Sequence, residues 1–217
     1  MGLFSVVLDL LFPPKCVFCG GLIGKKSEGL CRACAEKLPY LRGAAARATG
    51  DYFTVCVSPL KYDGHVRRSI LRYKFGGASH YAEVYGRMLA NCIREHLSGQ
   101  YDLITWVPLS KRRRHDRGYD QAMLLAMATA LCLSDVAVET LVKARHVQAQ
   151  SSLGGREARR ANVSGVFEVT DPDLIADKRI LLIDDIITTG ATLSECARTL
   201  LMAGAESVAC ATLARSD

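Results

Sequence analysis

Two adjacent aspartates, Asp184 and Asp185, stand at the end of an apolar run and are the strongest candidate catalytic residues. A hydroxyl-rich turn follows them, made of Thr188, Thr189, Gly190, Ala191 and Thr192. The N–H groups at a helix start bind phosphate, threonine hydroxyls add donors, and glycine lets a ligand approach the backbone. Carboxylates accept hydrogen bonds from vicinal sugar hydroxyls. The spacing therefore predicts a site for a ribose 5-phosphate.

Three other interpretations of this segment fit the sequence less well. A Walker-B aspartate requires an upstream phosphate loop, and the nearest approach, GGLIGKKS at 20–27, has the wrong tail. A receiver-like domain would need about a hundred further residues after its first acidic strand, but the chain ends at residue 217. A Rossmann turn requires Gly-x-Gly-x-x-Gly after a strand, and the sequence has none.

A second half-site is predicted in the segment 107–122, VPLSKRRRHDRGYDQA, which directly follows another apolar strand. Pro108 and Ser110 shape its turn, and positive charge comes from Lys111, Arg112 and Arg117, with Arg113 and Arg114 between them. The planar guanidinium of arginine binds two phosphate oxygens at once. We therefore expect pyrophosphate binding here, while a solvated face and a nucleic-acid patch remain alternatives for the outer residues.

Four cysteines near the N-terminus have the spacing of a zinc site. They form two Cys-x-x-Cys pairs separated by a short loop: Cys16, Cys19, Cys31 and Cys34. Two intervening residues let both sulfurs of a knuckle face one ion. A four-thiolate site is closed to substrate, so the predicted zinc is structural. A redox pair is the alternative, but it would not need a second copy.

The stretch 143–165 is polar, basic and without sustained periodicity, which is typical of a mobile lid. Closure of such a hood would exclude water from the reacting centre. The candidate ligand-binding residues within it are Arg145, Gln150, Arg156 and Arg159, with Asn162 beside them.

The elements that must position these residues alternate between strand and helix. Apolar strands are predicted at 102–109, 179–184 and 207–214, and helices at 119–133 and 191–202. This alternation predicts an α/β fold with an open parallel sheet. We expect an N-terminal zinc-ribbon-like module at 1–45, with the α/β domain at 46–217.

The overall composition is that of an ordinary globular protein with a mild affinity for anions. The chain has 217 residues, of which 49% are hydrophobic and 23% charged, and its net charge is +6. The stretch 1–14 lacks the basic start of a signal peptide and is too short to span a bilayer. Because the nine cysteines do not form a secreted disulfide framework, we expect a cytoplasmic protein.

The stretch ILLIDDIITTGAT at 180–192 resembles the phosphoribosyl-pyrophosphate (PRPP) motif of type I phosphoribosyltransferases. With the N-terminal LFPPKCVFCG and LCRAC and the central VPLSKRRRHDRGYDQA, the chain resembles the ComF family of competence-associated, amidophosphoribosyltransferase-like proteins. The resemblance implies PRPP bound with magnesium and a link to DNA uptake. It also implies partners that process single strands, such as a helicase-like competence protein. RGYDQA and HVQAQSSL depart from the family pattern, the latter by lacking the threonine that usually precedes the glutamine of the hood.

Two functions remain open at this point. In the first, the protein is an enzyme of nucleotide metabolism, a glycosyltransferase that moves the phosphoribosyl group to an acceptor and releases pyrophosphate. Stabilisation of the leaving group would supply most of the catalysis, and no residue stands out as a general base. In the second, the protein is a non-catalytic PRPP or nucleotide sensor that binds single-stranded DNA or a helicase-like partner.

Overall fold

The computed structural model describes residues 13–24, 27–144 and 165–216. The helices are α2 (Arg32–Lys37), α3 (Gly64–Phe75), α4 (Tyr81–Leu97), α5 (Lys111–Arg117), α6 (Gln121–Leu133) and α8 (Ala191–Met202), with short 3₁₀ turns η2 (Gly43–Ala46) and η3 (Pro172–Leu174). The strands are β1 (Arg47–Gly50), β2 (Phe53–Val57), β3 (Leu60–Lys61), β4 (Leu103–Trp106), β5 (Leu141–Lys143), β6 (Phe167–Val169), β7 (Arg179–Ile187) and β8 (Ser207–Arg215).

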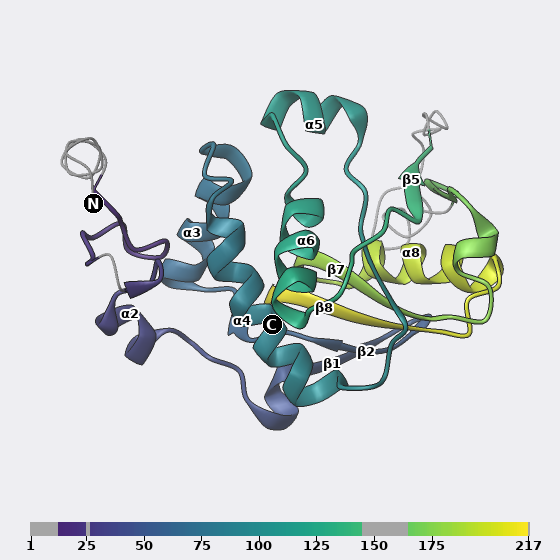
Figure 1. Cartoon of the computed structure of the whole chain (residues 1–217), viewed down its shortest axis with the longest axis horizontal. Coiled ribbons are helices and arrows are strands. Elements are labelled where there is room, and N and C mark those ends of the chain that lie inside the picture. The colour runs from purple at the N-terminus through teal and green to yellow at the C-terminus, as the bar shows by residue number, and fades with distance from the viewer. Residues whose placement is uncertain (1–12, 25–26, 145–164, 217) are drawn as a thin grey trace, which may run out of the picture.

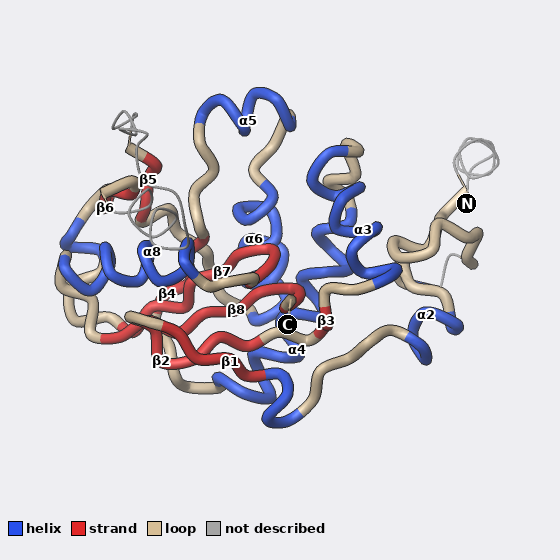
Figure 2. Tube along the Cα trace, turned by 180° about the vertical axis from the view of Figure 1, so that it is seen from behind, coloured by secondary structure: helices blue, strands red, loops and turns tan. Residues whose placement is uncertain are grey.

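The main sheet is open and mostly parallel, as the strand–helix alternation predicted. Its strands lie in the order β1-β2-β8-β7-β4, and β3 also pairs with β8 (Figures 1 and 2). The pairs β2–β8, β8–β7 and β7–β4 are parallel, whereas β1 runs antiparallel to β2 at one edge. The strands β5 and β6 form a separate antiparallel ribbon. The two aspartates lie on β7, an inner strand between β8 and β4.

Each face of the sheet is covered by its own helices because successive strand residues point to opposite sides. Leu181 and Ile183 of β7 belong to the buried cluster that α3, α4 and α6 complete. Ile180 and Leu182 belong to the other cluster, which includes the buried residues of α8. Figure 2, seen from behind, shows α8 on the near face of the sheet.

The connections that leave β4 and β7 pass to opposite faces of the sheet. The chain from β4 runs through α5 and α6, and the chain from β7 runs through α8 (Figure 1). Ligands of open α/β sheets bind at such a switch point, outside the carboxyl ends of the strands. The fold thus brings the two segments that carry the candidate residues to one edge.

Three local details differ from the sequence expectation. The basic segment after β4 is a helix, α5, rather than a turn: Ser110 caps its start and Gly118, at φ +78°, ends it. The strand β7 continues to Ile187, so Asp184 and Asp185 lie within it rather than at its end. The expected second-half helix begins at Gln121, since Asp120 is its cap.

The first cysteine knuckle packs into the main core. Val17 and Phe18 are buried and share a cluster with residues of α3, α4 and α6. The guanidinium of Arg72 donates hydrogen bonds of 2.8 Å to the carbonyl oxygens of both residues. The ring of Phe18 also lies 5.8 Å from that of Tyr85. The predicted module therefore shares its core with the α/β domain.

None of the helices in the described part of the chain has the length and apolar character needed to cross a membrane. Residues 1–12, most of the N-terminal stretch 1–14, lie outside the described residues.

Candidate ligand site and four-cysteine cluster

The predicted phosphate turn leads directly into α8. Gly190 is the cap of this helix with φ +75°, and its carbonyl oxygen accepts a 2.8 Å hydrogen bond from the N–H of Ser194. The N–H groups of the first helical turn have no partner within a helix and can bind a ligand. The N–H of Ala191 lies 3.4 Å from Oγ1 of Thr189, a contact that a ligand oxygen would have to replace. A hollow of about 40 Å³ lies here, and its lining is Asp184, Ile186, Ile187, Thr188, Thr189, Gly190, Ala191, Thr192 and Leu193. It holds a few water-sized groups, so a larger ligand must extend over the sheet edge.

The conformation of Gly190 gives a first prediction. A Cβ atom there would lie 3.7 Å from Ile187 Cδ1 and 3.9 Å from Phe53 Cζ, which are ordinary contacts. The cost of Gly190→Ala is therefore backbone strain at positive φ, about 1–2 kcal/mol, or a melting temperature lower by roughly 2–8 °C. The matched control is Gly24→Ala, because Gly24 has space and no positive φ. Equal melting temperatures of the two variants would contradict this explanation.

The two aspartates point to opposite faces of the sheet, as neighbours in a strand must. Asp184 is on the side of α8 and lines the hollow. Asp185 is on the side of α3, where its Oδ1 lies 2.8 Å from Nζ of Lys74. The N–H of Asp185 donates a 2.8 Å hydrogen bond to Oδ1 of Asp184. The structure thus brings Asp184 together with the turn, while contact of Asp185 with a sugar remains a prediction.

The carboxyl group of Asp184 is in an environment that disfavours its charge. Burial raises its pKa to about 8, and the negative charge of Asp185 adds to the effect. Hydroxyl donors from a ligand would stabilise the charged form. The unliganded site therefore holds a carboxyl group whose ionisation a sugar would favour.

This raised pKa makes the stability of the protein depend on pH. Because the folded state holds the Asp184 proton up to about pH 8 and an unfolded aspartate releases it near pH 3.9, the contribution of this group falls as pH rises between those values. Asp184→Asn removes the titration and keeps the oxygen that accepts from Asp185. We expect the melting temperature of the variant, relative to the original protein, to be higher at pH 8 than at pH 5. An equal difference in melting temperature between variant and original at pH 5 and pH 8 would contradict the raised pKa of Asp184.

The predicted pyrophosphate segment begins beside β7 and then leaves the sheet. The N–H of Val107 donates to the Ile183 carbonyl oxygen at 3.0 Å, which places Pro108 next to the aspartate strand. The Ser110 hydroxyl accepts from the N–H of Arg113 at 3.3 Å. No residue of α5 is buried, and the helix projects from the body (Figure 1). Lys111 and Arg112 are exposed.

Arg117, at the end of α5, is already engaged within the protein. Its Nη1 donates a 2.7 Å hydrogen bond to Oε1 of Gln121, and its guanidinium lies 4.7 Å from the ring centre of Phe75. None of the predicted pyrophosphate residues lines the small hollow. The structure therefore places them on the neighbouring loop and leaves their contact with a ligand as a prediction.

Three residues that the sequence did not single out support the site. Lys74 pairs with Asp185, and Asp120 joins the loop to α6 by accepting from the N–H groups of Leu109 and Met123, both at 3.1 Å. Burial lowers the pKa of Lys143, and the positive charge of Arg113 lowers it further. Only Asp120 had a sequence signal, as a cap residue before an apolar helix.

The four predicted cysteines lie together. Their sulfur atoms are all within 4.8 Å of one another, and Cys19 Sγ lies 3.8 Å from Cys31 Sγ. Tetrahedral zinc with 2.3 Å bonds separates its sulfurs by about 3.8 Å. The N–H groups of Gly21 and Cys34 each point at a ligand sulfur, at 3.4 Å. The cluster thus fits structural zinc, and Gly20, which directly follows the first cysteine knuckle, has a positive φ of +77°.

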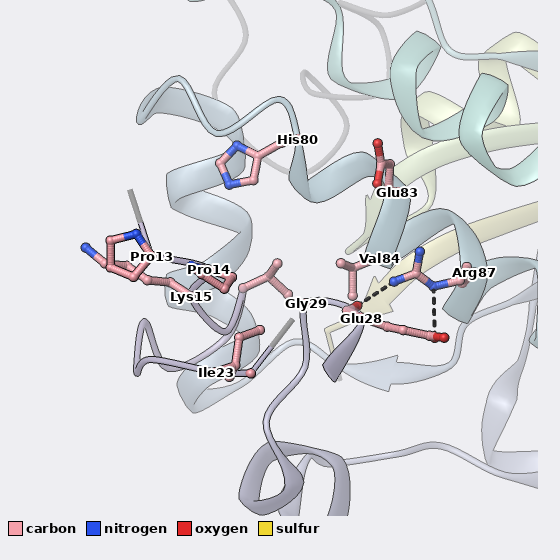
Figure 3. A pocket seen from close by; sticks show the side chains of 12 residues that line it. Pro13, Pro14, Lys15, Ile23, Glu28, Gly29, His80, Glu83, Val84 and Arg87 are labelled. Atoms are coloured by element: carbon pink, nitrogen blue, oxygen red, sulfur yellow. Dashed lines mark hydrogen bonds and ion pairs between the residues drawn. The ribbon is translucent and has the colours of Figure 1, made fainter. Parts of the chain in front are cut away.

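The hood residues and a second, larger cavity complete the description of the candidate regions. The predicted hood residues Arg145, Gln150, Arg156 and Arg159 lie outside the described residues. A cavity of about 580 Å³ lies between the cysteine module and α4, where Figure 3 shows Arg87 reaching Glu28 across the rim. Its lining includes none of the predicted site residues. The larger cavity therefore lies away from the predicted site residues, whereas the small hollow at the start of α8 includes several of them.

Comparison with known proteins agrees with this geometry. Residues 120–217 match the model of the phosphoribosyl transferase domain, and residues 7–62 match that of the double zinc ribbon domain. Competence protein F of Haemophilus influenzae is 29% identical over 224 residues, covering 93% of this chain and 97% of its own. Competence protein ComFC of Bacillus subtilis is 30% identical over 215 residues, covering 88% and 86%. DNA utilization protein YhgH of Escherichia coli O157:H7 is 34% identical over 110 residues, covering 49% and 46%.

The sheet, the turn before α8 and the family match define a protein of the type I phosphoribosyltransferase fold with an N-terminal four-cysteine zinc module. Within that class, the chain belongs to the family of competence proteins F and ComFC.

Proposed function

We propose that this protein binds PRPP, or a related ribose 5-phosphate ligand, at the carboxyl edge of the sheet and transfers the phosphoribosyl group to an acceptor. The observation that carries the proposal is the hollow shared by Asp184 and the turn Thr188–Thr192 at the start of α8. A helix N-terminus favours a phosphate, and an adjoining carboxylate favours sugar hydroxyls.

In this proposal, the turn holds the 5-phosphate and the aspartates orient the ribose. Magnesium, when bound with the ligand's pyrophosphate, supplies positive charge to the leaving group. The acceptor forms the new bond to C1 while the bond from C1 to the pyrophosphate oxygen breaks, so pyrophosphate leaves with the bonding electron pair. Pro108, Ser110, Lys111, Arg112 and Arg117 are the residues proposed to receive it. The hood residues Arg145, Gln150, Arg156 and Arg159 are proposed to close over the ligand.

The electrostatics of the loop support an anionic ligand. Burial lowers the pKa of Lys143, and the positive charge of Arg113 lowers it further, so these two cations influence each other. Like charges at this distance repel each other, and a bound anion would relieve the repulsion. A pyrophosphate group between α5 and β5 is the ligand that this arrangement favours.

The second candidate is a PRPP or nucleotide sensor that binds single-stranded DNA or a helicase-like partner. It is supported by α5, a helix with no buried residue whose exposed side chains include Lys111, Arg112, Arg113 and Arg114. The names of the relatives, which refer to competence and DNA utilization, agree with it. Basic side chains on a projecting helix suit a phosphate backbone.

A turnover experiment separates the two functions. The purified protein is given PRPP and magnesium with ammonia or each common nucleobase, and pyrophosphate release is measured above the rate without acceptor. The enzyme proposal predicts release with one of these acceptors. Binding of PRPP without release, combined with a changed affinity for a fluorescent single-stranded oligonucleotide, would favour the sensor.

A further inference from the structure

Lys74 reaches the candidate site from α3, a helix that precedes both segments of the proposed ligand site. Its Nζ lies 2.8 Å from Oδ1 of Asp185. The two side chains are 19% and 10% exposed, so the pair is largely removed from water. A carboxylate in such a place is costly unless a partner neutralises it. Lys74 is the cation that does so.

The end of α3 is held firmly enough to give Lys74 a fixed position. The hydroxyl of Tyr73 donates a 2.8 Å hydrogen bond to the carbonyl oxygen of Gln121 at the start of α6. On the other side of Lys74, Phe75 packs against the guanidinium of Arg117. Lys74 therefore lies between two residues, Tyr73 and Phe75, that contact the segment 107–122 of the proposed pyrophosphate site.

The Lys74 ion pair leaves part of the Asp185 carboxylate available. Among the described residues, the structure shows no hydrogen bond to the second oxygen of Asp185, Oδ2. A carboxylate has two oxygens and can accept from several donors. With Oδ1 directed to Lys74, no residue in the described part of the chain occupies the second oxygen, which can accept from a ligand hydroxyl.

We propose that Lys74 is a positioning residue: it neutralises and orients Asp185 so that the second carboxylate oxygen accepts a hydrogen bond from the 2-hydroxyl of ribose. This inference rests on the proposed function, because it assumes a sugar phosphate at the sheet edge. It predicts that Lys74 affects recognition of the sugar and not of the phosphate. A purely structural lysine would affect both ligands or neither.

The test compares three ligands by calorimetry: ribose 5-phosphate, 2-deoxyribose 5-phosphate and inorganic phosphate. Lys74→Met is the main variant, and Lys178→Met is the matched control because Lys178 is exposed just before β7 begins. We expect Lys74→Met to weaken ribose 5-phosphate binding by about tenfold to a hundredfold, as for a hydrogen bond to a charged group. Its affinity for inorganic phosphate should be unchanged, and its preference for ribose over 2-deoxyribose should fall towards one. The control should behave as the original protein.

Each other outcome overturns a distinct statement. If the original protein does not bind ribose 5-phosphate, the proposed function fails, and the role of Lys74 with it. If it prefers ribose and Lys74→Met keeps that preference, only the role of Lys74 fails. Equal losses for ribose 5-phosphate and inorganic phosphate would show that Lys74 acts on the phosphate, contrary to the inference. Lys74→Gln, which keeps a donor for Asp185, covers the case in which Lys74→Met does not fold. Because glutamine carries no positive charge, an unchanged ribose preference in that variant would show that Asp185 does not need neutralisation by Lys74, which also overturns the inference.

Discussion

Cys19→Ser should lose the stoichiometric zinc of the purified protein and melt at a markedly lower temperature. Four sulfurs within 4.8 Å of one another form a closed thiolate site, and zinc binding by such sites contributes about 10–16 kcal/mol to folding. The loss should spread beyond the module, because Val17 and Phe18 beside the knuckle are part of the main core. Elemental analysis and thermal unfolding measure the two effects.

The matched control for this variant is Cys132→Ser. Cys132 is partly exposed and lies outside the four-cysteine cluster. It should retain one zinc per chain and an unchanged melting temperature. A Cys19→Ser protein with a full equivalent of zinc would contradict the structural-site assignment.

Thr192→Asp should abolish binding of ribose 5-phosphate while leaving the fold intact. Thr192 lies in the first turn of α8 and lines the hollow with the proposed phosphate-binding residues. A carboxylate there would occupy the positive end of the helix and repel a phosphate. The same interaction stabilises the helix by about 0.3–1 kcal/mol, so the melting temperature should not fall. We expect affinity to drop by at least about a hundredfold, from the loss of charge-assisted hydrogen bonds.

Thr192→Ser is the control for this second prediction because it keeps the hydroxyl donor. It should bind ribose 5-phosphate with nearly the original affinity. Calorimetric titration of both variants checks the contrast. Equal binding by Thr192→Asp and Thr192→Ser would place the phosphate elsewhere.

The parts of the fold that local sequence determines were predictable. The helix 191–202 was predicted with the bounds that α8 has, because Gly190 marks its start and an apolar stripe follows. The four cysteines were predicted from spacing alone, since two short knuckles bring four sulfurs together wherever the module packs. Both features depend on residues that are close in the sequence.

The parts that depend on distant contacts were not predictable. Lys74 and Asp185 are far apart in the sequence, and neither residue type by itself indicates that the two form an ion pair. The basic segment 111–117 was expected to be a turn, yet the Ser110 cap and the Gly118 end make it a helix. The two aspartates were expected to act together, but their place within β7 points them to opposite faces.

The central claim is that the aspartate strand and the turn before α8 form a sugar-phosphate site. Calorimetric titration of PRPP with magnesium, into the original protein and into the double variant Asp184→Asn/Asp185→Asn, tests it most directly. The account predicts saturable binding by the original protein and a large loss of affinity in the double variant, with both proteins folded. Equal affinity of the two proteins, or no binding by the original, would contradict it.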